Sequence, residues 1–233
     1  MKKKVIAIIP ARSGSKSIKD KNIAKVKDKP LIAWSISTAK KCKYIDEFYI
    51  STDSPKYAKI AKTYGAKNII IRPLMISKDK SQDIEFVKHA IKNIDEDFEI
   101  IVHLRPTTPF RKIKDLNAAI VFFKKNKLFS SLRSVHEEAE TSYKSFEIKK
   151  KKLYPLNNIG KSIDQLNRAR QSFPKTYVAN GAFDLYRKSY ILKNHKLFGK
   201  QVMAFKTDFH FEIDTKEQLK YIKNIHAKNT YKK

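Results

Sequence analysis

Cysteine, glycine and acidic residues are all scarce in this chain of 233 residues. The single cysteine, Cys42, cannot form an internal disulfide, which is typical of a protein in a reducing cytoplasm. No apolar run approaches the ~20 residues that a membrane-spanning helix requires. No Ser/Gly/Pro-rich tract or low-complexity repeat marks a linker. We therefore expect one compact cytoplasmic domain over residues 1–233, without a membrane partner.

The amino-terminal segment has the basic start and apolar continuation of a signal peptide. Three lysines follow Met1, and an apolar run follows them. Arg12 interrupts this run before it reaches a suitable length. We therefore expect no export.

Basic residues outnumber acidic ones by 51 to 23, which gives a formal net charge of +28. Such an excess raises nucleic-acid binding as a competing hypothesis. Only eight of the basic residues are arginine, the side chain whose planar fork is suited to bases and phosphates. The two dense lysine runs, 2–4 and 149–152, contain no aromatic residue on which bases could stack. We expect no nucleic-acid partner and interpret most of the excess as solvated surface.

A basic loop follows an uninterrupted apolar run, 5–9, near the amino terminus. Such a run is typical of a strand buried on both faces of a parallel sheet, and ligands of these sheets bind at the carboxyl ends of the strands. The basic residues of the loop are Arg12, Lys16, Lys19 and Lys21. Its one glycine, Gly14, excludes a dinucleotide fingerprint or a P-loop, so side chains must help to hold phosphates. The alternative for these cations is exposed surface charge.

Strand and helix patterns alternate along most of the chain. Strands are predicted at 4–9, 48–51, 69–71 and 100–104, and helices at 30–41, 55–64 and 84–94. This order predicts right-handed βαβ units and a Rossmann-like, mostly parallel sheet with helices on both faces. Strand ends then bring Arg12, Asp53 and Arg105 to one edge. Segment 130–180 breaks the pattern, with short strands predicted at 142–148 and 153–154 around a lysine turn.

Two carboxylates near the carboxyl terminus are candidates for binding Mg²⁺. Glu212 and Asp214 are two residues apart in a predicted strand and therefore share a face. Mg²⁺ binds through one or two carboxylates together with substrate phosphates. Asp214 also begins a sequence with capping-box spacing, so the alternative is that it caps the last helix. The histidines and Cys42 show no zinc spacing.

Five ordered motifs resemble those of the acylneuraminate cytidylyltransferases, or CMP-sialic acid synthetases. They are IPARSGSK at 9–16 with KNI at 21–23, ISTD at 50–53, LRPTTPFR at 104–111, RQ at 170–171 leading to NGA at 180–182, and EIDT at 212–215. The resemblance implies a nucleotide-diphospho-sugar transferase fold. It also implies transfer of CMP from CTP to the anomeric hydroxyl of a nonulosonic acid, with release of pyrophosphate. An octulosonic acid or another nucleotide remains the alternative.

The resemblance further assigns residues to roles. The residues expected to bind the nucleotide are Ala11, Arg12, Ser13, Gly14, Asn22 and Arg72. Catalysis falls to Arg12, Lys16, Lys21 and Asp214, and metal binding to Glu212 and Asp214. Sugar-acid binding falls to Arg105, Arg168, Arg170 and Gln171. Segment 130–180 is implied to contain a small dimerisation arm that packs on a second subunit, which predicts a homodimer by analogy.

Some positions depart from the family pattern or admit another interpretation. Relatives commonly carry glutamine at position 105, so the guanidinium of Arg105 predicts a substrate different from ordinary sialic acid, or else a local ion pair. Relatives show Asp-x-Asp where this chain has Glu212 and Asp214, so the alternatives for Glu212 are that it binds the metal through water or that it does not bind the metal. Asp53 either supports the basic loop or only forms a turn, and Arg72 either contacts nucleotide or forms a surface pair.

Overall fold

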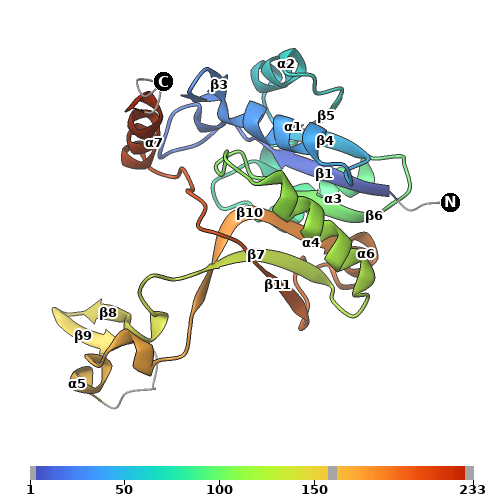
Figure 1. Cartoon of the computed structure of the whole chain (residues 1–233). Coiled ribbons are helices and arrows are strands. Elements are labelled where there is room, and N and C mark those ends of the chain that lie inside the picture. The colour runs from blue at the N-terminus through green and yellow to red at the C-terminus, as the bar shows by residue number, and fades with distance from the viewer. Residues whose placement is uncertain (1–3, 157–161, 229–233) are drawn as a thin grey trace.

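A seven-stranded sheet forms the body of the protein (Figure 1), for which a computed structural model describes residues 4–156 and 162–228. The strand order is β11-β7-β10-β6-β1-β4-β5. The strands are β1 (Lys4–Pro10), β4 (Glu47–Thr52), β5 (Asn68–Ile71), β6 (Phe98–His103), β7 (Ser131–Glu137), β10 (Tyr177–Arg187) and β11 (Val202–Lys206). Only β10 runs antiparallel to its neighbours, β6 and β7. The predicted mostly parallel sheet is therefore confirmed.

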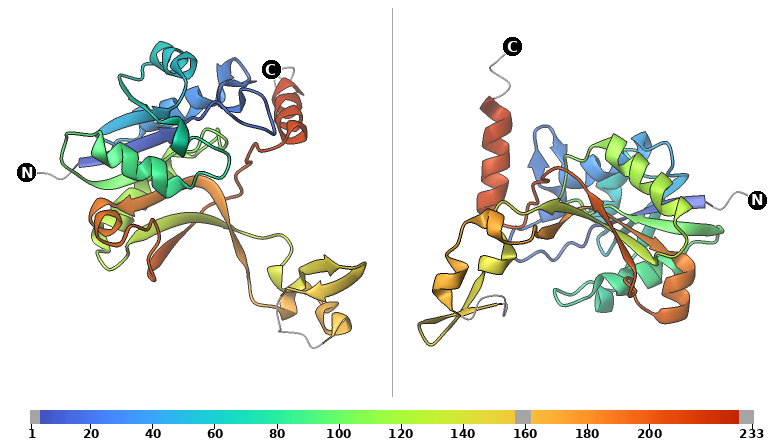
Figure 2. Two further views of the ribbon diagram at one scale, coloured as in Figure 1. Left: turned by 180° about the vertical axis from the view of Figure 1, so that it is seen from behind. Right: turned by 60° about the horizontal axis from the view of Figure 1, so that its bottom comes forward.

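Helices cover both faces of this sheet, as predicted, and Figure 2 shows α4 on one side with α3 and α6 on the other. The helices of the body are α1 (Leu31–Lys41), α2 (Pro55–Thr63), α3 (Asp83–Lys92), α4 (Ile113–Lys125), α6 (Lys188–Asn194) and α7 (Lys216–Lys228). Alternate residues of β1 enter different cores. Val5, Ala7 and Ile9 pack with α1, α2 and α4, whereas Ile6 and Ile8 pack with α3 and α6. This explains why the strand is apolar throughout.

Short elements join the sheet to its helices. They are η1 (Lys21–Ile23), β2 (Lys25–Val26), β3 (Lys29–Pro30) and η2 (Leu74–Ile76). Pro30 is the residue before α1 rather than its first residue. Helix α2 begins at Pro55 behind Ser54, whose Oγ accepts from the backbone N–H of Tyr57 at 3.3 Å. It ends before Gly65, which adopts φ 89°, a conformation that favours glycine.

A small arm projects from the body between β7 and β10 (Figure 1). It contains η3 (Ser142–Lys144), the hairpin β8 (Phe146–Lys149) and β9 (Lys152–Pro155), α5 (Ile163–Leu166) and η4 (Arg170–Ser172). The predicted hairpin is confirmed, although its first three predicted residues form a 3₁₀ turn. Both ends of segment 130–180 belong to the main sheet, and its residues 157–161 lie outside the described part.

Across residues 4–156 and 162–228, no helix combines the length and apolarity needed to cross a bilayer.

Candidate functional site

A cavity of about 200 Å³ lies at the carboxyl ends of the parallel strands. It is lined by Pro10 at the end of β1, by residues of the basic loop and by residues that follow β5 and β6. The predicted site residues that line it are Arg12, Lys21, Asn22, Arg72 and Arg105. Segments far apart in the sequence therefore meet at the edge of the sheet that the strand pattern predicts.

The basic loop is held in place by hydrogen bonds from outside it. Asp53, directly after β4, accepts from the backbone N–H and from Oγ of Ser13, both at 2.8 Å. Asn22 donates from Nδ2 to the backbone oxygen of Arg12 at 2.9 Å. The backbone N–H of Ala11 donates to Ser51 at 2.8 Å. Of the two interpretations of Asp53, the structure supports the one in which it braces the loop.

Arg12, Lys16 and Lys21 of the loop are paired with carboxylates from distant segments. Asp79 receives Nη1 of Arg12 at 2.8 Å and Nζ of Lys16 at 2.7 Å, and these two contacts, that of Lys16 first, lower the pKa of the Asp79 carboxyl. Lys21 pairs with Asp214 at 2.8 Å. Arg12 and Lys21 face the cavity, whereas Lys16 is 85% exposed and does not line it. The loop therefore binds anionic groups, which in this structure are the carboxylates of Asp79 and Asp214.

Arg72 is a buried cation in the cavity wall. It donates from Nε to Oγ of Ser51 at 3.2 Å and from Nη2 to the Ser51 backbone oxygen at 3.0 Å. Its guanidinium lies 4.8 Å from the centre of the Phe86 ring. Burial lowers its pKa to about 10. The alternative of a surface ion pair is therefore wrong, because the residue is only 5% exposed.

Arg105 lines the same cavity but is already paired with two carboxylates. Nη1 donates to Oδ2 of Asp184 at 2.7 Å, and Nη2 donates to Oδ2 of Asp83 at 2.8 Å. Burial opposes its charge, but Asp184 and Asp83 raise the pKa overall. The structure thus shows the local ion pair that was the alternative for this residue, and places that pair inside the cavity wall.

Sequence reasoning missed Asp184 and gave no role to Arg111. Asp184 is 2% exposed and also receives Nε of Arg133 at 3.1 Å and the hydroxyl of Tyr186 at 3.3 Å. The available signal was an acidic residue inside the apolar stretch 182–185. Arg111 donates to the backbone oxygens of Ala182 and Arg105, and burial lowers its pKa to about 9. It ties the segment after β6 to β10.

The predicted strand around Glu212 and Asp214 is wrong. Residues 207–215 have no regular secondary structure, because this segment is attached by isolated contacts rather than by a ladder. Thr107 provides two of them, since its backbone oxygen accepts from the N–H of Ile213 at 2.9 Å and its Oγ1 donates to Glu212 at 3.3 Å. Within the part of the chain that the structure describes, no group of three or more His, Cys, Asp or Glu is arranged to hold a metal ion.

Asp214 does not cap the last helix, so that alternative is also wrong. The cap is a reciprocal pair one residue later. Oγ1 of Thr215 accepts from the backbone N–H of Gln218 at 3.2 Å, and Oε1 of Gln218 accepts from that of Thr215 at 2.9 Å. The carboxylate of Asp214 therefore stays available to Lys21.

The other residues predicted to bind the sugar acid lie on the arm, outside the cavity of Arg105. Arg170 and Gln171 line a separate cavity of about 270 Å³. Nη2 of Arg170 lies 3.5 Å from Oε1 of Glu137, and the guanidinium of Arg168 lies 5.0 Å from the centre of the Phe173 ring. Within a single subunit, Arg170 and Gln171 therefore lie at a different cavity from Arg105.

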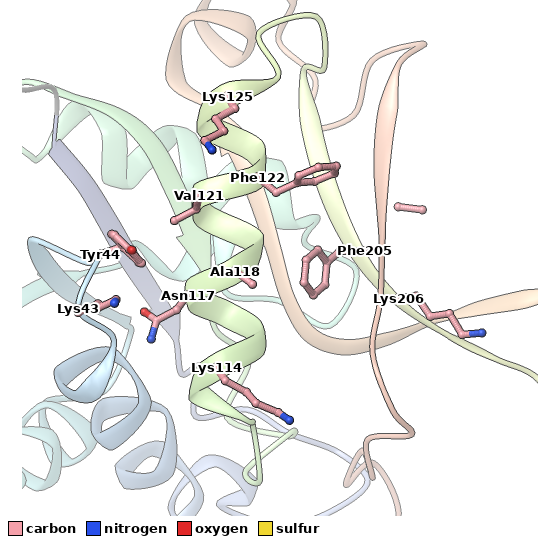
Figure 3. A pocket seen from close by; sticks show the side chains of 11 residues that line it. Lys43, Tyr44, Lys114, Asn117, Ala118, Val121, Phe122, Lys125, Phe205 and Lys206 are labelled. Carbon is pink, nitrogen blue, oxygen red and sulfur yellow. The ribbon is translucent and has the colours of Figure 1, made fainter.

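A larger cavity of about 640 Å³ lies between α4 and β11 (Figure 3). Apolar side chains such as Val121, Phe122 and Phe205 line it together with lysines. None of the predicted site residues contributes to it. Its size alone does not make it the site of phosphate chemistry.

Residues 6–233 match the family model described as Cytidylyltransferase. An N-acylneuraminate cytidylyltransferase of Escherichia coli is 32% identical over 225 residues, which cover 95% of this chain and 51% of that protein. The chain thus spans about half the length of this relative. The CMP-N,N'-diacetyllegionaminic acid synthase of Campylobacter jejuni is 29% identical over 94% of this chain and 93% of its own length.

A solved structure supports the same fold. The CMP:2-keto-3-deoxy-manno-octonic acid synthetase complexed with CTP superimposes with a TM-score of 0.75, covering 97% of this chain and 99% of the other at 13% identity. The 4-diphosphocytidyl-2C-methyl-D-erythritol synthase of Anaerococcus prevotii gives a TM-score of 0.66 at 14% identity. The nucleotide-diphospho-sugar transferase fold is therefore shown.

Proposed function

The chain belongs to the cytidylyltransferase family, and we propose that it transfers CMP from CTP to the anomeric hydroxyl of a nonulosonic, sialic-acid-like sugar acid, releasing pyrophosphate. The observation that carries this proposal is the cavity shared by Arg12, Lys21, Arg72 and Arg105. It combines a cationic loop at a strand's carboxyl end with a polar wall. The names of the relatives supply the acid class as a hypothesis.

The basic loop would hold the triphosphate. Arg12 and Lys16 converge on Asp79, and Lys21 reaches Asp214, so each already binds an anionic oxygen. Phosphate oxygens would exchange with these carboxylates when CTP binds. Because positioning and charge neutralisation dominate phosphoryl transfer, the same cations would stabilise the leaving pyrophosphate. Asp53 and Asn22 keep the loop in place during this exchange.

Mg²⁺ is the metal that the donor set fits. Two carboxylates, Asp214 and Glu212, lie on the segment beside the loop, and Mg²⁺ commonly takes one or two protein carboxylates together with phosphates and waters. Asp214 would hold the ion, with Glu212 as a second or water-mediated ligand. When bound, the ion would supply charge neutralisation at the phosphates.

The arm would complete the site of a second subunit in a homodimer. Arg168, Arg170 and Gln171 lie outside the cavity of their own chain, and Arg170 has a planar fork suited to a substrate carboxylate. Ile148 and Leu156 of the arm are 75% and 61% exposed, and such apolar exposure suits an interface. We therefore propose that each arm brings Arg170 to the partner's cavity.

Pyrophosphate release in the presence of CTP tests the proposed function. The purified chain is assayed with Mg²⁺ and a panel of nonulosonic and octulosonic acids, and mass spectrometry identifies the CMP-sugar product. We expect turnover with at least one nonulosonic acid and none without acid. Turnover confined to octulosonic acids would select the alternative substrate class. Absence of turnover from CTP with every acid of the panel would refute the proposal.

A further inference from the structure

Part of the cavity wall offers hydrogen-bond acceptors, which do not suit a phosphate or a carboxylate. Asp83 and His103 lie there beside Arg105, and we call Asp83 and His103 the acceptor pair. Nη1 and Nη2 of Arg105 each donate to a carboxylate, Asp184 and Asp83 respectively. A substrate carboxylate that bound to the guanidinium of Arg105 would have to displace Asp184 or Asp83. The charge of Arg105 is therefore balanced before any substrate arrives.

His103 offers a lone pair rather than a proton. It is fully buried in the cavity wall, and its Nδ1 lies 3.3 Å from the hydroxyl of Tyr186. That hydroxyl donates to Asp184, which as a carboxylate only accepts, so Nδ1 of His103 must be the donor to Tyr186. Nε2 is then unprotonated and, among the described residues, has no hydrogen-bond partner. Burial, followed by the charge of Arg105, lowers the pKa of His103 and keeps it neutral.

Asp83 offers a second acceptor. Its Oδ2 receives Arg105, and its side chain is 46% exposed where it lines the cavity. Oδ1 has no hydrogen-bond donor within the described part of the chain. Arg105 thus fixes the position of the carboxylate and leaves one oxygen for a ligand.

We propose that the acceptor pair binds a hydrogen-bond-donating substituent of the sugar acid, namely an amine, an amide N–H or a hydroxyl. This inference rests on the proposed function and names the feature by which the same site selects among acids. A buried acceptor that stays unpaired is costly, so acids lacking the donor are penalised. One hydrogen bond to a charged group corresponds to about a ten- to hundredfold preference.

The test compares acids that differ at a single ring carbon. Nonulosonic acids with an acetamido group, a hydroxyl or only hydrogen at that carbon are assayed at saturating CTP with wild type, Asp83→Ala, Asp83→Asn and His103→Leu. The matched control is Asp97→Asn, which removes a charge from an 83% exposed side chain that lines none of the cavities described above. Thermal unfolding of each variant checks that it is folded.

We expect wild type and Asp97→Asn to prefer the donor-bearing acid over the deoxy acid by at least about tenfold in kcat/KM at one carbon. Asp83→Ala should reduce this ratio to within about threefold of unity, with Asp83→Asn and His103→Leu intermediate and the KM for CTP within about twofold. An unchanged ratio in Asp83→Ala would overturn the inference. If the acid ratio of Asp83→Ala is unchanged and its KM for CTP is raised, the hydrogen-bond donor that Asp83 recognises would be on cytosine rather than on the sugar acid. Because wild-type turnover is measured first, either result leaves the proposed function standing.

Discussion

The guanidinium of Arg105, just beyond β6, donates to the carboxylate of Asp184 on β10 across 2.7 Å. This contact joins a parallel strand to the one antiparallel strand of the sheet, at the register where Asp184 lies opposite His103. Strand β10 also leads from the arm into the body. The same ion pair therefore supports the cavity wall and the strand that carries the arm.

Arg105→Gln should destabilise the protein by roughly 3 kcal/mol, because it removes one partner of a buried carboxylate. The double variant Arg105→Gln/Asp184→Asn should regain more than half of this loss. Urea unfolding of the two single variants and the double variant gives the coupling free energy between the side chains of Arg105 and Asp184. In assays of folded Arg105→Gln, preference among sugar acids should shift with little change in the KM for CTP. Additive losses would show that the two side chains are energetically independent.

Asp214→Ala should abolish turnover, because it removes the predicted metal ligand and the partner of Lys21. Glu212→Ala should reduce kcat less. Thr215→Ala is the matched control: it should cost about 1 kcal/mol of stability through loss of the helix cap while keeping kcat. Steady-state kinetics across a Mg²⁺ titration measure the loss of catalysis, and thermal unfolding measures the loss of stability, so the two effects can be distinguished. Near-normal kcat for Asp214→Ala at saturating Mg²⁺ would remove Asp214 from the site.

Arg12→Ala should lower kcat/KM by at least about two orders of magnitude, since a pre-placed charge that stabilises transferred phosphate is worth ~3 kcal/mol. Folding should survive, because the side chain is 30% exposed. Lys19→Ala, in the same loop and exposed, is the control and should change kcat/KM by less than about threefold. Unaltered CTP kinetics in Arg12→Ala would contradict the assignment of this loop to triphosphate binding.

Mixing two inactive variants tests whether the arm serves the partner's cavity. Arg12→Ala impairs the cavity of its own chain, whereas Arg170→Ala impairs the arm. In a mixed dimer, one cavity with intact Arg12 would receive an intact Arg170, so activity should reappear after subunit exchange. Light scattering measures the oligomeric state, and Ile148→Lys, on the exposed hairpin, should weaken the dimer. No recovery between variants that demonstrably exchange subunits would argue against a shared site.

Arg170→Lys complements this experiment. Lysine keeps the charge but loses the bidentate fork, so kcat/KM should fall for all acids alike.

His103 should make stability depend on pH. Burial holds its folded pKa well below the ordinary 6.5, so only the unfolded chain takes up this proton as the pH falls below that value. Stability is therefore lost on acidification, by up to about 1.4 kcal/mol per pH unit for this group. Urea unfolding from pH 7.5 to 5 should show a shallower decline in His103→Leu than in wild type.

The sequence alone determined the parallel strands β1, β4, β5 and β6 and the place of the loop, whereas it did not predict β7, β10 or β11. Val5 to Ile9 is apolar at every position because both faces of β1 are buried, and this local pattern needs no knowledge of distant contacts. Arg12, Asp53 and Arg105 follow strands, so the parallel order brought them to one edge. The same reasoning fails at 212–214, where the alternation predicts a strand but the structure has none, because no neighbouring strand pairs with this segment.

The tertiary structure decided which charges face each other. Asp79 meets Arg12 across 67 positions of the chain, and Asp184 meets Arg105 across 79. No spacing rule reaches so far, because such pairs depend on how loops and strands pack rather than on local periodicity. The sequence therefore determined where the candidate polyanion site lies, through strand ends and their cations. Only the fold decided which of those cations stay available to a substrate, because burial and ion pairing arise when distant segments meet.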